Sequence, residues 1–258
     1  MSNLIGQILS NRYLVEGSLG RGGMAEVYKA WDQERAVYLA LKVLRQDLSR
    51  DVVFLRRFKR EAMTLEKLQH PNIVRFYGIE KDDLTVYILM DYIDGTTLQD
   101  EIFRSEGCAC KDDFVSLILK SVSSALHYAH NMGLIHCDIK PGNIMINKEG
   151  RIFITDFGIA RMTDAATATM VGFGTPAYMA PELVRGHDPT IQSDIYSLGV
   201  ILYEMVTGGE RPFTGELARI TGSTSEKVRW EHVDLDPPSP RLHNPNLSPE
   251  LDVIILKC

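Results

Sequence analysis

The spacing of apolar residues changes along this chain, and that change limits the fold more than any other feature. Up to about residue 94, β-branched and aromatic residues form short runs typical of strands, at Tyr13–Val15, Val27–Ala30, Val37–Leu44, Ile73–Tyr77 and Thr85–Met90. Beyond the turn at Asp94-Gly95, longer segments follow the helical period. A β-rich part followed by a mainly helical part predicts an α+β protein with two lobes, 1–92 and 93–258, within one domain.

The helical part contains well-marked segments. The segment Asp112–Met132 predicts a helix with a buried face of Phe114, Leu117, Ile118, Val122, Ala125, Leu126 and Ala129. A second helix is predicted from Ser193, as its capping residue, to Val206, with an inward face of Ile195, Leu198, Leu202 and Met205. Short strands are predicted near Ile144–Ile146 and Ile152–Ile154, and the apolar run Leu251–Leu256 indicates a further helix.

Composition and charge argue against several classes of function. With 45% hydrophobic and 24% charged residues, the 258-residue chain is typical of a folded protein. The net charge of -6 argues against a nucleic-acid partner, because such partners favour a basic surface. The 4 cysteines lack disulfide-scaffold spacing, and we interpret Cys108-Ala-Cys110 as free thiols rather than part of a metal site. We expect a cytoplasmic location and no membrane segment in this chain.

A glycine-rich turn, Gly20-Arg21-Gly22-Gly23, lies between the first two predicted strands. Glycine lets such a turn bring its backbone N–H groups close to phosphate oxygens. A dinucleotide-binding turn would be followed by a helix, whereas a strand follows here. By itself the turn is equally consistent with an ordinary hairpin.

Lys42 stands in the middle of an apolar strand. Because side chains alternate along a strand, Ala40 and Lys42 share one face, and Leu41 and Val43 share the other. One explanation is a lysine that protects a sheet edge from aggregation. The other is an ammonium group that reaches a phosphate site beneath the glycine-rich turn.

Glu61 interrupts a predicted helical stripe made by Phe54, Phe58, Leu65 and Leu68. A carboxylate on a buried stripe is unfavourable unless a cation pairs with it. We expect Lys42 to be that cation. The alternative is an exposed pair with Arg57, one helical turn away, which would stabilise the helix only weakly.

Polar groups gather in His136-Cys137-Asp138-Ile139-Lys140-Pro141-Gly142-Asn143 and again in Asp156-Phe157-Gly158. The first segment combines a carboxylate, an ammonium and an amide, which together can accept a proton, balance phosphate charge and bind a metal. Asp156 directly follows an apolar strand, a position that suits a Mg²⁺ ligand. The sequence Asp-x-Gly is also a common turn, so this second motif is weak alone.

The order of these parts resembles the signature of eukaryotic-like (Hanks-type) serine/threonine protein kinases, and the turn and Gly174–Glu182 are most similar to bacterial members. The resemblance adds Ala180-Pro181-Glu182 to the series and runs from about Tyr13 to the end of the chain. It implies a small β-rich N-lobe with one key helix and a larger, mainly helical C-lobe. It also implies transfer of the γ-phosphate of ATP to Ser/Thr hydroxyls of proteins, with autophosphorylation.

The resemblance implies catalytic roles for the matching polar residues. Asp138 would orient the acceptor hydroxyl and take its proton, while Lys140 would steady the γ-phosphate. Asn143 and Asp156 would hold Mg²⁺. Asp194, near the start of its helix, would support the catalytic loop.

The resemblance also implies a nucleotide site. Lys42 would bind the α/β-phosphates and pair with Glu61. The phosphate-binding turn would use Gly20, Gly22 and Gly23. The adenine site would be formed by Val27, Ala40, Met90, Asp91, Ile93 and Met145. An apolar spine is implied at Leu65, Phe76, His136 and Phe157.

Two of the departures from the family affect the expected regulation and the expected C-lobe. Cys137 replaces the arginine that receives a phosphorylated loop residue, so we expect activity to depend little on phosphorylation of the loop threonines Thr163, Thr167 and Thr169. The final helices of the family, and the arginine that pairs with the equivalent of Glu182, do not appear in the sequence. We therefore expect a C-lobe that is truncated at its C-terminus and a Glu182 without its partner.

Two other functions fit the same fold. The main alternative is a nucleotide-binding pseudokinase or scaffold module, although such modules usually lack at least one of the polar residues retained here. The second is a small-molecule kinase of the antibiotic-phosphotransferase type. The Ala180-Pro181-Glu182 segment and the long loop before it favour protein substrates instead. Protein substrates and ATP are thus the expected partners, with a homodimer as a further alternative.

Overall fold

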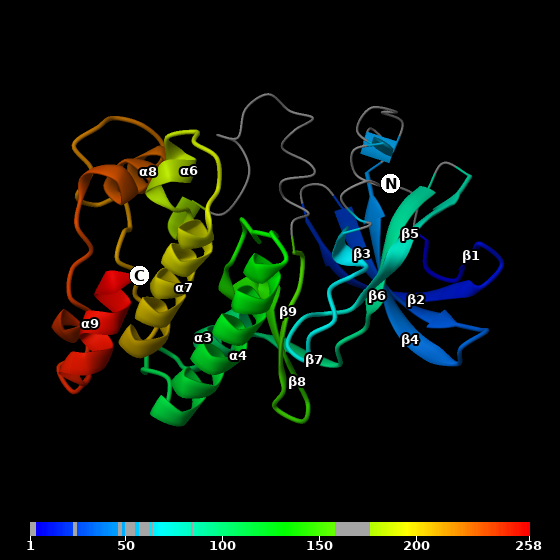
Figure 1. Ribbon diagram of the computed structural model, residues 1–258, viewed down its shortest axis with the longest axis horizontal. Helices are drawn as coiled ribbons and strands as arrows, with labels where there is room; N and C mark the ends of the chain where they lie inside the picture. The colour runs from blue at the N-terminus through cyan, green and yellow to red at the C-terminus, as the bar shows by residue number, and fades with distance from the viewer. Residues whose placement is uncertain are drawn as a thin grey trace. The chain divides into compact units, whose positions relative to one another are not determined.

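The computed structural model of the chain describes residues 4–22, 25–45, 48–49, 55–56, 62, 64–83, 85–157 and 176–258. The chain forms two compact units, Met1–Asp94 and Gly95–Cys258. The first is built mainly from strands and the second mainly from helices (Figure 1). The predicted α+β class is therefore confirmed.

An antiparallel sheet of six strands, in the order β1-β2-β3-β4-β6-β5, forms most of the described part of the first unit. The strands are β1 Ile8–Leu9, β2 Tyr13–Arg21, β3 Ala25–Asp32, β4 Val37–Leu44, β5 Phe76–Asp82 and β6 Thr85–Asp91. The strand predicted to begin at Ile73 begins at Phe76 instead. Ile73 instead ends a turn, in which its amide donates to the His70 carbonyl at 3.1 Å.

The two faces of this sheet differ in what they cover. Leu39, Leu41 and Val43 of β4 belong to a buried apolar cluster that also contains Tyr28, Ala30, Tyr87 and Leu89. The register pairs Val27 with Lys42 and Ala40 with Met90. Because directly paired residues of an antiparallel sheet share a face, these four side chains lie on the face opposite the apolar cluster.

The position of Lys42 in the sheet decides between its two explanations. Strand β4 pairs with β3 on one side and with β6 on the other, so it is an interior strand. The sheet-edge explanation for Lys42 is therefore wrong. Lys42 is half-buried on the face that it shares with Val27 and Ala40.

The helix predicted to carry Glu61 is described only in part. Ala62, Thr64 and Leu65 are helical, and Leu65 and Leu68 are buried, as the predicted stripe requires. Phe54, Phe58 and Glu61 lie outside the described residues, so the pairing of Glu61 with Lys42 stays a prediction.

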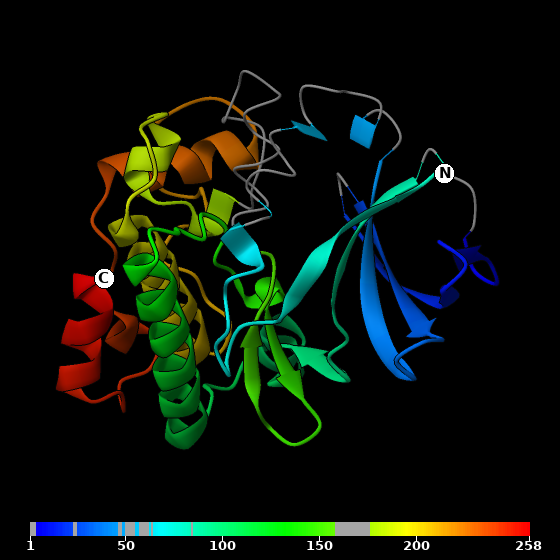
Figure 2. The ribbon, with the colours of Figure 1, turned by 45° about the vertical axis from the view of Figure 1, so that its right-hand side comes forward.

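The second unit combines helices with a small sheet in the order β7-β8-β9. The strands are β7 Gly95–Thr97, β8 Ile144–Asn147 and β9 Ile152–Ile154. The helices are α3 Leu98–Arg104, α4 Asp112–Asn131, α6 Pro181–Val184, α7 Ile191–Thr207, α8 Thr224–Asp234 and α9 Pro249–Lys257, with 3-10 turns η1 Pro141–Asn143, η3 Pro176–Tyr178 and η4 Pro240–Leu242. Helix α7 packs against both α4 and α9 (Figures 1 and 2).

The structure confirms the predicted buried faces of α4 and α7, except for residues at the edge of each face. In α4, Ile118, Val122, Ala125, Leu126 and Ala129 are buried together with Val115, but Leu117 is 42% exposed and Phe114 only half-buried. In α7, Leu198, Leu202 and Met205 are buried, whereas Ile195 is 40% exposed. The margin of each buried face depends on how far the neighbouring elements reach over it.

The start of α7 also differs from the prediction. Thr190 is the residue before the first helical turn, and Ser193 lies inside that turn. The Ser193 hydroxyl accepts a hydrogen bond from the Thr190 amide at 3.0 Å and donates one to the Glu182 carboxylate. Ser193 thus satisfies an amide at the helix start from within the helix, and it links the helix to α6.

We expect Gly208→Ala to destabilise the protein by about 2–4 kcal/mol. Gly208 ends α7 with φ 78°, in the left-handed region, where an alanine is strained. A Cβ there would also lie 2.1 Å from the Gly107 carbonyl oxygen, so two backbone segments would have to separate. Urea denaturation of the two proteins measures this difference.

Gly186→Ala is the matched control for that prediction. Gly186 has φ 77°, but a Cβ there meets no atom within 4 Å. The free energy of unfolding of this variant should fall by only about 1 kcal/mol, the cost of an alanine in the left-handed region. Equal losses in the two variants would show that the contact with Gly107 is unimportant.

The described cysteines are free thiols, as predicted. Within the described residues, no three His, Cys, Asp or Glu side chains gather as metal ligands. Every helix in the described ranges is too short or too polar to cross a membrane.

Candidate active site

The polar side chains of the loop before β8 converge on Asp138. The Lys140 ammonium lies 2.7 Å from the Asp138 carboxylate. The Asn143 amide nitrogen donates to that carboxylate at 3.1 Å and to the Asp138 backbone carbonyl at 2.8 Å. The three residues are brought together as the sequence predicts, because the turn η1 folds Asn143 back onto Asp138.

Asp194 supports this loop from helix α7. Its carboxylate accepts the backbone amides of His136 at 2.8 Å and of Cys137 at 2.9 Å. The same side chain, only 1% exposed, also meets the Nε2 atom of His130 at 2.8 Å. The predicted contact between Asp194 and the loop is confirmed.

His130 is a member of this network that the sequence analysis missed. It belongs to α4, where it continues the buried i, i+4 series of Val122 and Leu126. A histidine in such a series signals a buried polar contact. Its partner Asp194 is 64 positions away and follows from no local pattern.

The backbone between His136 and Asp138 is strained. Cys137 has φ 69°, a left-handed conformation that a residue other than glycine rarely adopts. The hydrogen bonds from the His136 and Cys137 backbone amides to the Asp194 carboxylate fix the backbone at the N-terminal side of this strained residue. The Cys137 thiol, meanwhile, points to the Ile135 carbonyl at 3.6 Å.

His136 connects the loop to the end of β9. Its Nδ1 accepts the Asp138 amide at 3.2 Å, so the proton of a neutral ring lies on Nε2, which donates to the Thr155 carbonyl at 2.9 Å. The ring also packs edge-on against Phe157, with 4.6 Å between centroids. This contact is the part of the predicted spine that lies in the second unit; Leu65 and Phe76 belong to the first.

Asn143 and Asp156 offer oxygen atoms that suit Mg²⁺. The backbone amide of Thr155 donates to the backbone carbonyl of Asn143 at 3.0 Å. Asn143 therefore lies beside the residue that precedes Asp156. Because the Asn143 amide nitrogen is committed to Asp138, the oxygen of that side chain is the atom that suits a cation. Asp156 adopts φ 65°, a second left-handed residue next to the loop.

In the first unit, the glycine-rich turn joins two paired strands. Gly20 pairs with Val27, and the Gly22 amide donates to the Ala25 carbonyl at 2.9 Å. A strand follows the turn, as expected, so the dinucleotide-binding alternative does not fit. Gly23 lies outside the described residues.

The residues predicted to form the adenine site lie in two units. In the first, Ala40 and Met90 are each 7% exposed, and Val27 and Ile93 are half-buried. The segment after Met90 is held by Asp91, whose amide donates to the Arg75 carbonyl at 3.0 Å and whose carboxylate accepts the Tyr77 hydroxyl at 2.7 Å. In the second unit, Met145 is half-buried in β8, where it pairs with Phe153 of β9.

The segment Pro176–Glu182 is fastened to α7 at several points. The Tyr178 hydroxyl donates to Glu204 at 2.7 Å, and the Ser197 hydroxyl donates to the Tyr178 carbonyl at 2.7 Å. Burial raises the pKa of Glu204, and it also raises the pKa of Tyr178. Glu182 is half-buried and accepts the Ser193 hydroxyl. Ser193 therefore supplies a hydrogen bond to Glu182, while the expectation that the arginine partner of the family is missing stays a prediction.

Comparison with known proteins agrees with this geometry. Residues 13–258 match the family described as the protein kinase domain. The chain is 40% identical over 257 residues to serine/threonine-protein kinase PknB of Mycobacterium tuberculosis, and 39% identical over 256 residues to serine/threonine-protein kinase PrkC of Bacillus subtilis. These alignments cover 96% and 98% of this chain but only 40% and 38% of the relatives.

A solved structure shows the same fold. The crystal structure of the Mycobacterium tuberculosis PknI kinase domain aligns with a TM-score of 0.73 and 27% identity, over 98% of this chain and 90% of that one. The extent of this structural alignment agrees with the family match, which covers residues 13–258. The chain therefore belongs to the protein kinase family, and it is similar to bacterial serine/threonine kinases over nearly its whole length.

Proposed function

We propose that this chain transfers the γ-phosphate of ATP to serine and threonine hydroxyls of proteins, including its own. The observation that carries the proposal is the convergence of Lys140 and Asn143 on Asp138, in a loop fixed by Asp194. The names of the relatives support the same activity. A scaffold without catalysis would not need this convergence of polar side chains on Asp138.

Asp138 is proposed to act as the base. Its carboxylate would accept the proton of the attacking hydroxyl, and its hydrogen bond from Asn143 would fix its direction. The Lys140 ammonium, 2.7 Å from Asp138, would balance the charge of the transferred phosphate. Most of the rate gain would come from positioning and from charge stabilisation.

The cofactor is proposed to be Mg²⁺, which when bound neutralises charge on the phosphate oxygens. The Asn143 amide oxygen and the Asp156 carboxylate would be its protein ligands. Only two protein ligands are typical of Mg²⁺, which keeps waters and binds substrate phosphates.

The nucleotide is proposed to use the residues predicted from sequence. Lys42 would contact the α/β-phosphates, with Glu61 as its partner, and the glycine-rich turn would supply backbone amides. Val27, Ala40 and Met145 would contact the adenine ring, next to Met90 and the backbone of the segment Asp91–Ile93. Protein substrates, a cytoplasmic location and weak dependence on loop phosphorylation remain part of this proposal; Thr163, Thr167 and Thr169 lie outside the described residues.

Labelled phosphate transfer tests the proposal. Purified protein with Mg²⁺ and γ-labelled ATP should label casein and itself, and mass spectrometry should locate the label on serine or threonine. Removing Mg²⁺ with excess EDTA should abolish transfer, because the phosphate charge is then unbalanced. Binding of Mg²⁺ and ATP without any transfer would contradict the proposal and favour the pseudokinase alternative.

A further inference from the structure

The face of the first sheet that carries Lys42 is crossed by successive rows of paired side chains. In order away from the glycine-rich turn, these rows are Val27 with Lys42, Lys29 with Ala40 and Met90, and Trp31 with Tyr38. Residues that follow one another on one face of a strand are about 7 Å apart. Each row therefore lies about one such step further from the turn than the row before it.

Lys29, in the second of these rows, places its ammonium group against two aromatic rings. Its Nζ atom lies 3.7 Å from the ring centroid of Tyr38 and 5.0 Å from the ring centroid of Tyr92. The two tyrosine rings meet edge-on, with 6.1 Å between centroids, and Trp31 packs edge-on against Tyr38 at 4.9 Å. Lys29 is half-buried, and the attraction between a cation and a ring face is stronger where water is partly excluded.

These contacts hold a segment that the sheet itself does not hold. Strand β6 ends at Asp91, and Tyr92 follows outside it. Asp91 is fixed from the β5 side, because its carboxylate accepts the Tyr77 hydroxyl at 2.7 Å. Tyr92 is held from β3 and β4 instead, through its ring contacts with Lys29 and Tyr38. The segment after β6 is thus fixed from two sides.

The proposed nucleotide would run along the rows of this face. Its phosphates would lie at the glycine-rich turn and at Lys42, which belongs to the first row. An extended nucleoside triphosphate is longer than one step between rows. Its base would therefore reach the second row, where Lys29 pairs with Ala40 and Ala40 pairs with Met90, close to the segment after β6.

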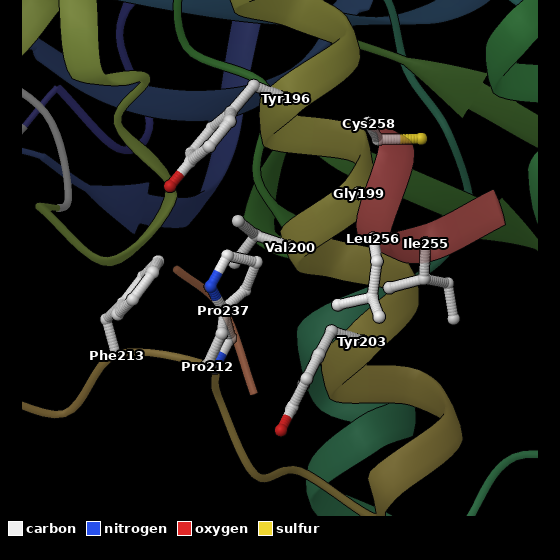
Figure 3. A pocket seen from close by; sticks show the side chains of 10 residues that line it. All are labelled: Tyr196, Gly199, Val200, Tyr203, Pro212, Phe213, Pro237, Ile255, Leu256 and Cys258. Atoms are coloured by element: carbon white, nitrogen blue, oxygen red, sulfur yellow. The ribbon is translucent and has the colours of Figure 1, made fainter. Parts of the chain in front are cut away.

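A cavity in the second unit is a poor alternative site for the nucleotide. It lies beside α7 and α9, as Figure 3 shows, and its volume is about 130 Å³. Pockets that hold ligands of this size usually measure about 300–1,000 Å³. Apolar side chains such as Val200, Phe213 and Leu256 line it, and its described lining includes neither lysine nor arginine. A triphosphate would lose its hydration there without gaining a cation.

We propose that Lys29 is a positioning residue for the base of the nucleotide. Its ammonium group holds the ring of Tyr92 and so fixes the backbone of the segment Asp91–Ile93, to which the base is proposed to bind. Lys29 acts through this segment and needs no contact with the nucleotide. The inference rests on the proposed function, and it adds a cation outside the phosphate site to the groups that set the affinity for ATP.

Two substitutions of Lys29 test this inference. Methionine keeps the apolar stem but removes the charge, whereas arginine keeps a cation that stacks on aromatic rings. Without the contact the segment leaves the binding arrangement more often, so the affinity for ATP should fall about fivefold in Lys29→Met. It should fall less than about twofold in Lys29→Arg, and the KM for casein should change less than about twofold in both. Lys81→Met removes the same charge at an exposed position of β5 and should leave the affinity unchanged.

Tyr92→Leu shows whether Lys29 acts through the ring of Tyr92. Once that ring is removed, Lys29→Met should cost little further affinity for ATP, because the contact is already lost. Additive losses would overturn the positioning role, and so would equal losses in Lys29→Met and Lys81→Met or an unchanged affinity in Lys29→Met. A wild type that binds ATP but transfers no phosphate would contradict the proposed transfer alone. A wild type that binds no ATP would overturn both.

Hydrogen exchange in the nucleotide-free protein measures the position of the segment directly. Backbone amides of residues 91–93 should exchange faster in Lys29→Met than in the wild type, because the segment opens more often. Their exchange in Lys29→Arg and in Lys81→Met should match that of the wild type. Exchange that stays unchanged in Lys29→Met would show that the segment is fixed without Lys29, and the inference would be wrong.

Discussion

Asp138→Asn should lower phosphate transfer by about 10²–10⁴-fold, the usual contribution of a positioned base. The amide has nearly the shape of the carboxylate but cannot take a proton from the acceptor hydroxyl. It also removes the negative charge that faces the Lys140 ammonium at 2.7 Å. Labelled transfer to casein and fluorescence-detected nucleotide binding measure the two properties separately.

Nucleotide binding is the internal control for Asp138→Asn. We expect the affinity for ATP to change little, because Asp138 is proposed to act on the acceptor hydroxyl. Asp236→Asn makes the same chemical change at an exposed position and should leave transfer unaffected. Transfer at the wild-type rate in Asp138→Asn would show that this carboxylate is not the base.

Much of the fold follows from local patterns in the sequence. Alternation along β4 placed Ala40 and Lys42 on one face, and the register agrees because alternation is a property of any strand. The start of α7 was missed because Thr190 and Ser193 are both good capping residues. The choice depends on Glu182, which takes the Ser193 hydroxyl and lies 11 residues earlier in the chain.

The contacts of the candidate site also divide into those that the sequence predicts and those that it does not. Asp138, Lys140 and Asn143 lie within one short loop, so their convergence could be predicted from sequence spacing and from the family resemblance. The contacts of His130 with Asp194 and of His136 with the Thr155 carbonyl join segments 64 and 19 residues apart. Such partners are set by how α4, α7 and β9 pack, which no local pattern determines.

Asp194→Asn should produce the largest combined loss of stability and activity. The carboxylate uses one oxygen for the Cys137 amide and the other for the His136 amide and His130. An asparagine has one oxygen, so its NH₂ group must face a buried donor. We expect a loss of about 2–4 kcal/mol in the free energy of unfolding, since a buried polar group loses its partner.

The loss of activity in Asp194→Asn should exceed what unfolding explains. When the hydrogen bond from the Cys137 backbone amide to residue 194 is lost, the strained backbone at Cys137 is no longer fixed. Asp138 follows directly after Cys137 in the chain. A displacement of about 1 Å at a reacting group costs about 10²-fold in rate. Transfer should therefore fall on that order at a temperature where urea denaturation shows the variant folded. Asp188→Asn, an exposed change just before α7, is the matched control. If Asp194→Asn loses stability but keeps its rate while folded, then the loop holds Asp138 in place without this helix.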